Sequence, residues 1–374
     1  MGAGNGEVAP ETNMKKASAA KKSAPKKSAR TKAKVKVKIK ALAKTKRPAQ
    51  AAPAGRVWVG LDLGGTKMLA NVFDDQYRVL GRAKQKTQGA KGARAGLKRM
   101  VETVTAALAD AGVDPSSLAG IGVGCPGPID PSRGVIVEAP NLGWRNVPVE
   151  AHLGTAFGVR TVICNDVDAG VYAEYQAGAA KGARCAVGIF PGTGIGAGAV
   201  IEGRLLQGSS LSCMELGHIP LFPETSGMGE DGTTLETECS RLKIAIEAAR
   251  AAYRGQAPHL FEACGTDISK ITSGALAKAI AAGDTEIENI VRRAATLLGC
   301  GVATVVHLLA PDVIVLGGGL VEAMPKLYLE AVRKSTLARI LAPYRKSLRI
   351  VTATLTEGSG SMGAAAWARK TIEG

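Results

Sequence analysis

Residues 57–67 combine a strand-like apolar run with residue types that can hold a phosphate. The run 57–63 is typical of a buried strand, and the two glycines and threonine that follow are typical of a tight hairpin turn. Adjacent glycines let backbone N–H groups close around phosphate oxygens, while a lysine adds charge and an aspartate can hold Mg²⁺ through water. The residues concerned are Asp62, Gly64, Gly65, Thr66 and Lys67. Alone, this segment fits either a phosphate site or a simple turn.

Two further glycine clusters also follow apolar runs. Residues 192–196 read Gly-Thr-Gly-Ile-Gly between two such runs, and residues 317–319 are three glycines at the end of another. Two strand–turn–strand units, about 130 residues apart, could grip a polyphosphate chain from both sides. The third cluster would let a flat ring such as adenine approach. Each cluster could be only a turn, but the three together favour nucleotide binding.

A carboxylate lies where a predicted strand gives way to a predicted helix, in the segment Cys-Asn-Asp-Val-Asp at residues 164–168. Phosphoryl transfer needs a carboxylate that orients and deprotonates the acceptor hydroxyl, and Asp166 could be that group. Equally, Asn165 or Asp166 could be a helix N-cap, which is a common role for these residue types. Asp168 is expected on the solvent side or as a cap.

Several polar residues could bind a sugar, because carboxylates and amides form paired hydrogen bonds with hydroxyls. Glu215 and His218 follow a predicted hairpin, and Glu236 opens a predicted helix. Asn141 lies in a loop close to Trp144. Each of these signals is weak alone, and His218 could equally be an ordinary surface residue.

Most of the net charge of +16 lies in the N-terminal segment. Residues 1–50 hold 15 of the 48 Lys and Arg but only two of the 32 Asp and Glu, which leaves +3 for the remainder. Residues 1–55 contain no aromatic residue and are predicted to be a disordered Lys/Ala/Pro-rich tail. This tail could bind polyanions non-specifically. It could also be a solubilising tail, or an extension that results from a misassigned start codon.

The seven scattered cysteines and the absence of an apolar signal core or membrane-length run predict a cytoplasmic protein.

From residue 56 onward, apolar patterns predict strands alternating with helices, with hairpins before helices in each half. Strands are expected at 57–63, 68–73, 77–84, 119–124, 134–137, 160–164, 184–190, 195–201, 204–206, 312–316 and 348–354. Helices are expected at 94–111, 167–180, 235–252, 273–282, 284–309, 322–336 and 360–371. The fold class is therefore α/β, built twice over.

In this order the motifs resemble the ROK family (repressor, open reading frame, kinase) of sugar kinases, within the actin-like ATPase superfamily. The matching segments are GLDLGGTK at 60–67, GIGVGCPGPID at 120–130, NLGW at 141–144, CNDVDAGVYAEYQAG at 164–178, GTGIGAGAVIEGRLLQGSS at 192–210, ELGH at 215–218, LE at 235–236, VLGGGL at 315–320 and GSMGAAAWA at 360–368. The resemblance spans about residues 56–374 and is highly specific.

This resemblance implies two RNase-H-like α/β domains around a central cleft, at 56–166 and 167–359, with the final helix (360–374) packing back on the first. It makes Asp166 the general base. It implies sugar binding by Asn141, Asn165, Asp166, Glu215, His218 and Glu236. It implies nucleotide binding by Asp62, Gly64, Gly65, Thr66, Lys67, Thr193, Gly194, Gly318 and Gly319, with ATP and Mg²⁺ as cofactors.

One segment departs from the family pattern. Many members bind structural zinc there through three cysteines and a histidine, but the cysteine positions here are Gly227, Gly229 and Thr234. We therefore expect no zinc site, and His218 free of a metal.

The leading hypothesis is an ATP-dependent hexokinase, most simply a glucokinase making glucose 6-phosphate, and a homo-oligomer like many relatives. The alternatives are a polyphosphate-dependent glucokinase, an N-acylmannosamine kinase or a fructokinase. A sugar-responsive regulator is a further alternative, although the N-terminal segment lacks a helix-turn-helix pattern. The exact hexose, the donor, the oligomeric state and the role of residues 1–55 stay open at this point.

Overall fold

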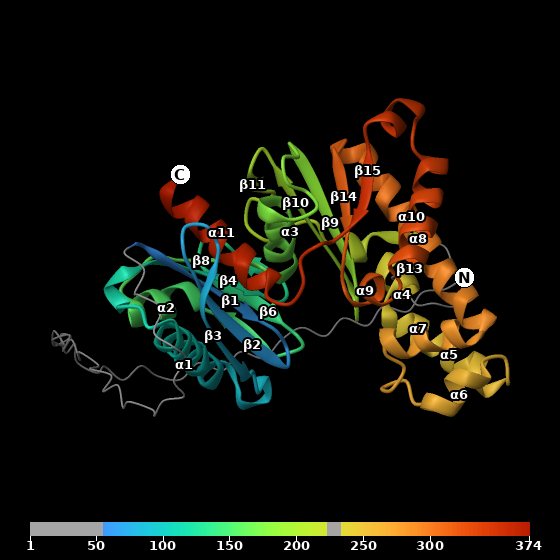
Figure 1. Ribbon diagram of the computed structural model, residues 1–374, viewed down its shortest axis with the longest axis horizontal. Coiled ribbons are helices and arrows are strands. Elements are labelled where there is room, and N and C mark those ends of the chain that lie inside the picture. The colour runs from blue at the N-terminus through green and yellow to red at the C-terminus, as the bar shows by residue number, and fades with distance from the viewer. Residues whose placement is uncertain (1–54, 223–232) are drawn as a thin grey trace, which may run out of the picture. The chain divides into compact units, whose positions relative to one another are not determined.

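The computed structural model describes residues 55–222 and 233–374 (Figure 1). The predicted disordered tail, residues 1–55, lies outside these ranges except for Gly55, and so do Gly227 and Gly229 of the expected zinc-free segment. The strands are β1 (Val57–Leu63), β2 (Lys67–Phe73), β3 (Val79–Lys86), β4 (Leu118–Cys125), β5 (Ile129–Asp130), β6 (Val135–Ala139), β7 (Trp144–Val147), β8 (Thr161–Asn165), β9 (Cys185–Pro191), β10 (Ile195–Ile201), β11 (Arg204–Leu205), β12 (Pro220–Phe222), β13 (Thr233–Thr234), β14 (Val313–Leu316) and β15 (Arg349–Thr352). The α-helices are α1 (Ala93–Ala111), α2 (Val149–Phe157), α3 (Asp166–Ala177), α4 (Leu235–Cys239), α5 (Arg241–Tyr253), α6 (Pro258–Cys264), α7 (Ser273–Ala282), α8 (Thr285–Leu309), α9 (Gly319–Ala323), α10 (Pro325–Arg339) and α11 (Ser359–Glu373).

Two five-stranded sheets share one topology. The first has the order β3-β2-β1-β4-β8 and the second has the order β11-β10-β9-β14-β15. In each sheet the first three strands pair antiparallel as successive hairpins, and the last two pair parallel. The parallel strands are reached through helical crossovers, as parallel pairing requires. The predicted α/β architecture that is built twice is therefore present, and each sheet begins with a hairpin that carries a glycine turn.

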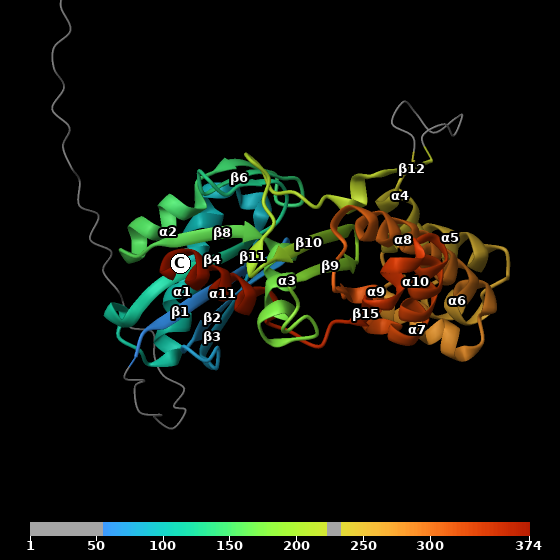
Figure 2. The same cartoon turned by 90° about the horizontal axis from the view of Figure 1, so that it is seen from above.

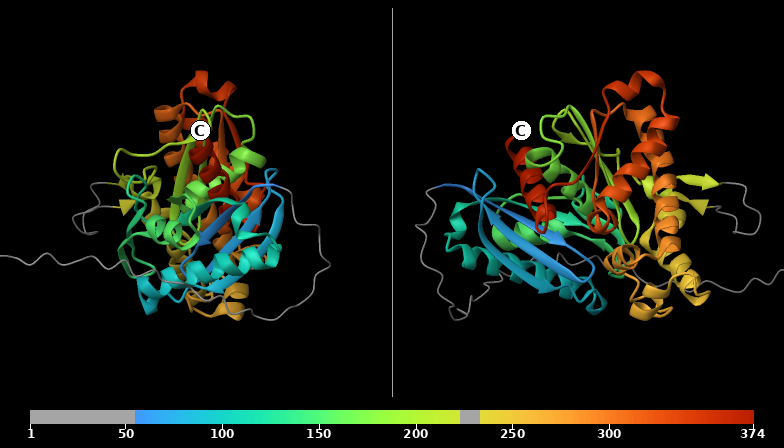
Figure 3. Two further views of the ribbon diagram at one scale, coloured as in Figure 1. Left: turned by 90° about the vertical axis from the view of Figure 1, so that its left-hand side faces the viewer. Right: turned by 45° about the vertical axis from the view of Figure 1, so that its right-hand side comes forward.

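The first sheet is covered on both faces. Alternate residues of β1, such as Val59 and Leu61, are fully buried in the core beneath α1. Trp58, which points to the other face, packs with Ala365 of α11. Figure 3 shows α11, in red, beside the blue strands of this sheet. Such burial on both faces explains why residues 57–61 of β1 are apolar without alternation.

The final helix lies against the first sheet and α3 (Figure 1). Glycines make this close packing possible, because a Cβ at Gly122 of β4 would overlap the carbonyl of Ala364. A Cβ at Gly363 of α11 would likewise overlap the carbonyl of Ala169 in α3. The helix that ends the chain therefore packs directly on the helix that begins with Asp166.

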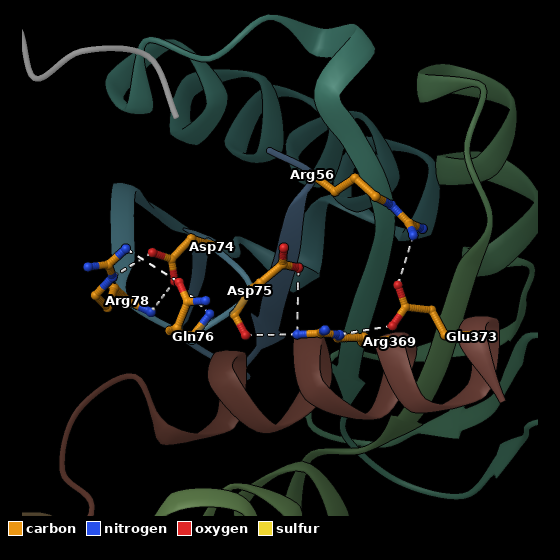
Figure 4. A network of polar contacts seen from close by, with 7 residues as sticks. All are labelled: Arg56, Asp74, Asp75, Gln76, Arg78, Arg369 and Glu373. Atoms are coloured by element: carbon orange, nitrogen blue, oxygen red, sulfur yellow. Dashed lines mark hydrogen bonds and ion pairs between the residues drawn. The ribbon is translucent and has the colours of Figure 1, made fainter. Parts of the chain in front are cut away.

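A polar network anchors the outer end of α11 (Figure 4). Arg369 donates to the Asp75 carbonyl at 2.8 Å and pairs with Glu373 at 3.0 Å. Glu373 in turn pairs with Arg56, just before β1, at 2.9 Å. These contacts join the last helix to the first strand and to the turn between β2 and β3.

The second half carries a group of helices, α5 to α8 and α10, that pack together beside the second sheet (Figure 2). By length and composition alone, α8 could cross a membrane, but 56% of its apolar window is buried inside the protein. Its apolar stripe packs in the core with α10 and α5, which accounts for its composition.

The structure corrects two predicted helices. The helix expected at 235–252 is two helices, because Ser240 is extended (φ −69°, ψ 159°) and caps α5 through its hydroxyl. The helix expected at 322–336 is likewise two, since Met324 is non-helical and Pro325 begins α10. The short helices α2 and α6 were not predicted.

The close approach of α11 predicts that Gly122→Ala destabilises the fold by about 1–3 kcal/mol, because an added methyl group forces the Ala364 backbone away. Chemical denaturation measures this loss. Gly274→Ala in α7 is the control, since its new methyl group would meet only ordinary contacts. Equal stability of the two variants would contradict this packing.

Candidate active site

The first glycine turn, residues 64–66, joins β1 to β2. The Gly64 N–H donates to the Lys67 carbonyl at 3.0 Å, which closes the hairpin. Thr87 holds the turn from outside. Its hydroxyl donates to the Gly64 carbonyl oxygen at 2.6 Å, and its N–H donates to the Thr66 carbonyl oxygen at 2.9 Å. Within the described residues, the N–H groups of Gly65 and Thr66 have no hydrogen-bond partner. The turn is therefore fixed in shape and leaves two adjacent donors available to an anion.

The second glycine turn, residues 192–194, joins β9 to β10. The Gly192 N–H donates to the Gly194 carbonyl at 2.8 Å. Glu236, at the start of α4, accepts from the Ile195 N–H at 2.7 Å and lies against Gly194. Across the part of the chain that is described, the N–H groups of Thr193 and Gly194 lack a partner. Both hairpins thus expose two consecutive N–H groups, and Glu236, a predicted sugar ligand, also holds the second turn.

The third glycine cluster lies beside the strand that leads into the second turn. The Gly317 N–H donates to the Ile189 carbonyl of β9 at 3.1 Å. Gly318 has φ +78°, and a Cβ there would come within 2.9 Å of the Pro191 carbonyl oxygen. Gly319 then begins α9. The predicted adenine contacts and the predicted phosphate contacts therefore adjoin one another in the second half.

Asp166 is the first residue of α3 and directly follows β8. Burial raises its pKa, and the charges of Asp62 and Glu215 raise it further. The Val167 N–H, which donates to its carboxylate at 3.0 Å, opposes this effect. The resulting pKa of Asp166 is about 6, which suits a carboxylate that takes a proton near neutral pH.

Asp62 comes from the end of β1, beside the first glycine turn. Burial raises the pKa of Asp62, and the charge of Lys67 partly offsets that rise. β1 and β8 are the parallel neighbours of β4, so their carboxyl ends lie at the same edge of the sheet, and the charge of Asp62 raises the pKa of Asp166.

The structure decides which of the two candidate residues caps α3. Asn165 is the N-cap of α3, since its side-chain oxygen accepts from the Val167 N–H at 2.8 Å. Its amide nitrogen donates to the Gly127 carbonyl at 3.3 Å. Because Asn165 performs the capping, Asp166 is not needed for it.

The expectation for Asp168 was wrong. It is neither on the solvent side nor the cap, but only 3% exposed. Its Oδ1 atom has no hydrogen-bond partner in the described ranges, and a Cβ at Gly198 of β10 would lie 2.5 Å from that atom. Burial, followed by the charges of Asp166 and Glu215, raises the pKa of Asp168 well above its usual value.

The other predicted sugar ligands are distributed around these groups. The Asn141 amide lies by the first glycine turn, where a Cβ on Gly65 would be 3.1 Å from Nδ2. Glu215 is exposed and acts on both Asp166 and Asp168 electrostatically, while His218 is exposed at the end of a single 3₁₀ turn. Trp144, in contrast, is buried and donates to the Gly89 carbonyl at 3.2 Å, so it belongs to the core.

One cation at the candidate site carries no signal in the sequence. Arg241, the first residue of α5, donates from Nη2 to the Thr193 hydroxyl at 2.9 Å. It lies 48 positions from Thr193, outside any glycine motif, and the predicted continuous helix concealed the break at Ser240 that brings it there.

The chain belongs to the ROK family, whose sequence pattern matches residues 58–371. A glucokinase from Streptomyces coelicolor is 28% identical over 316 residues, which is 83% of this chain and 97% of that protein. The crystal structure of a ROK family glucokinase from Streptomyces griseus in complex with glucose and AMPPNP has a TM-score of 0.71 at 28% identity, covering 84% of this chain and 99% of that one. The ROK hexokinase from Thermus thermophilus has a TM-score of 0.70 at 31% identity, covering 85% and 99%. These likenesses confirm the predicted family and fold class.

The burial of Asp168 predicts an unusual pH dependence of stability. In the unfolded chain this carboxyl ionises near its ordinary pKa, whereas the folded protein keeps it neutral to higher pH. Wild-type stability therefore falls with rising pH, relative to Asp168→Asn, whose amide does not titrate. In urea denaturation from pH 4 upward, the free energy of unfolding of Asp168→Asn should rise relative to that of the wild type. A difference that is constant with pH would contradict the raised pKa of Asp168.

Proposed function

We propose that this protein is a sugar kinase that transfers the γ-phosphate of ATP to a hexose hydroxyl. Glucose, phosphorylated on its 6-hydroxyl, is the substrate we favour, because relatives named glucokinases align with nearly their full length. The observation that carries the proposal is the position of Asp166, a carboxylate with a pKa of about 6 at the start of α3, in a fold whose two halves each present a glycine turn. The reaction would take place in the cytoplasm, where ATP is available.

In this proposal, the N–H groups of the two glycine turns bind oxygens of the donor's phosphate chain, and Lys67 adds a positive charge. Asp166 accepts the proton of the attacking hydroxyl and orients that oxygen toward the phosphorus. Asn141, Asn165, Glu215, His218 and Glu236 are the candidate hydrogen-bond partners of the other sugar hydroxyls. The adenine ring is assigned to Gly318 and Gly319. Two domains, residues 56–166 with α11 and residues 167–359, would each supply part of the site.

The residues present fit a magnesium ion that arrives with the nucleotide. Asp62 is a half-buried carboxylate beside the first glycine turn, and no hydrogen bond from the described residues satisfies it. Asp62 could therefore hold the ion through water, as hard cations prefer oxygen ligands and often keep part of their hydration. When bound, the ion would neutralise charge on the donor phosphates.

A polyphosphate-dependent glucokinase is the second candidate, and the charge of the N-terminal segment favours it. Residues 1–50 carry 15 Lys and Arg against two acidic residues, enough to concentrate a polyanionic donor. N-acylmannosamine kinase and fructokinase differ from a glucokinase only in the sugar. A regulator without kinase activity would not need a carboxylate whose pKa is about 6.

The proposal predicts that the full chain phosphorylates glucose with ATP, and that Asp166→Asn lowers kcat by roughly 10²–10⁴-fold while calorimetric glucose binding persists. A coupled assay over a hexose panel, with ATP or polyphosphate, measures this. Asp110→Asn on α1 is the control for loss of a carboxylate outside the site. Wild-type turnover by Asp166→Asn would exclude it as the base.

The raised pKa of Asp166 also predicts the acid side of the pH–rate profile. Only the carboxylate can accept a proton, so kcat/KM for the sugar should fall roughly tenfold per pH unit below about pH 6. An aspartate at its ordinary pKa would keep the rate constant down to about pH 4. Initial rates at saturating ATP distinguish the two. A profile that stays level through pH 5 would contradict the environment described for Asp166.

A further inference from the structure

The two glycine turns differ in the charge that their own sequences supply. The first is followed directly by Lys67, whereas residues 192–196 contain no charged side chain. Because a donor's phosphate chain is highly anionic, a second turn without a cation would stabilise it only through N–H dipoles and one hydroxyl. In the folded chain, a cation from another element, Arg241 of α5, lies against the second turn.

Arg241 makes two contacts with the second glycine turn. Its backbone N–H donates to the Gly192 carbonyl at 2.8 Å, and its guanidinium donates from Nη2 to the Thr193 hydroxyl at 2.9 Å. The turn is thereby held at one end by Arg241 and at the other by Glu236, which accepts from the Ile195 N–H. The guanidinium therefore lies beside the two N–H groups that the turn leaves available.

The break between α4 and α5 creates this placement. Ser240 ends α4 and its hydroxyl accepts from the Lys243 N–H, so α5 begins at Arg241. In a continuous helix the Arg241 N–H would bond within the helix rather than to the turn. The extended Ser240 therefore frees this N–H for Gly192.

The guanidinium of Arg241 has capacity for a further anion. The nearby carboxylates of Glu238 and Glu247 pair with Lys243 instead, at 3.9 and 3.4 Å. Only one of the five N–H donors of an arginine is used by the Thr193 hydroxyl. Arg241 is partly exposed, so its remaining donors can reach a ligand. A planar guanidinium matches two phosphate oxygens at once, which a neutral side chain cannot do.

We propose that Arg241 binds the phosphate chain of the phosphoryl donor and gives the second glycine turn the cation that Lys67 gives the first. This assignment rests on the proposed kinase function. A purely structural role, in which Arg241 only holds Thr193 in place, is the alternative that the test must exclude.

The test compares Arg241→Gln and Arg241→Lys in the full chain. Glutamine removes the charge but can still donate to Thr193, and its unchanged backbone still donates to Gly192. Lysine keeps the charge. Arg250→Gln, on the same helix but 65% exposed and paired with Glu247, is the matched control for loss of one positive charge. Thermal unfolding of each variant checks that the fold is retained.

We expect Arg241→Gln to raise the KM for ATP roughly tenfold or more, as befits the loss of a charge-assisted hydrogen bond, with the KM for glucose within about twofold. Arg241→Lys should recover much of this loss, and Arg250→Gln should resemble the wild type. An unchanged KM for ATP in Arg241→Gln, or an equal effect in Arg250→Gln, would overturn the assignment. An effect on kcat and both KM values that lysine does not relieve would indicate the purely structural role.

Calorimetric binding of AMPPNP and of tripolyphosphate separates this assignment from the proposed function. If the wild type binds either probe and Arg241→Gln binds it roughly tenfold more weakly, the assignment holds even if no hexose is phosphorylated. If the wild type binds a probe and Arg241→Gln binds it equally well, the assignment of Arg241 is wrong, but the proposed kinase function still stands. If the wild type binds neither probe, both fail together.

Discussion

Repulsion among carboxylates that lie close together, one buried and others half-buried, is the constraint on which the candidate site depends. Asp62, Asp166 and Asp168 come from the ends of β1 and β8 and the first turn of α3, and Glu215 acts on two of them. Ionised together without cations, these groups would destabilise the fold. Burial raises the pKa values of Asp62, Asp166 and Asp168, and neighbouring carboxylates raise those of Asp166 and Asp168 further. A site of this kind is complete only when positive charge enters it, and the surrounding elements supply that charge and the dipoles of free N–H groups.

Duplication explains where those compensating groups lie. Each half begins with a hairpin whose turn leaves two N–H groups available, and the strand order is the same in both sheets. The equivalence is not complete, because Lys67 follows the first turn directly while Arg241 reaches the second from α5. α11 then packs on β1, β4 and α3, the elements that carry or adjoin Asp62 and Asp166. The last helix, α11, thus packs against the elements that position these acidic groups.

The sequence was sufficient to predict the elements that follow strong local rules. Apolar runs bounded by glycines predicted β1, β2, β9 and β10 almost to the residue, and helical periodicity predicted α1 and α8. The short helices α2 and α6 offered too few turns for a periodic signal. The break at Ser240 was missed because a serine inside an apolar periodic pattern reads equally well as a surface residue.

The residues of the candidate site also fall into those that a local sequence pattern indicates and those that it does not. Asp62 and Asp166 became candidates because each lies at the end of a predicted strand. The burial of Asp168 depends on Gly198 of β10, a neighbour that only the folded chain provides. Arg241 depends on a helix break and on a turn 48 residues away, and no local pattern links the two.

In the proposed reaction, this arrangement moves a phosphoryl group to an alcohol activated by Asp166. ³¹P NMR of the full chain with glucose, ATP and Mg²⁺ tests it most directly, because the product signal identifies the bond formed. We expect a sugar phosphate monoester and ADP in equal amounts, and roughly 10²–10⁴-fold slower formation of both with Asp166→Asn. Hydrolysis of ATP to free phosphate alone, or no change with any hexose and either donor, would contradict it.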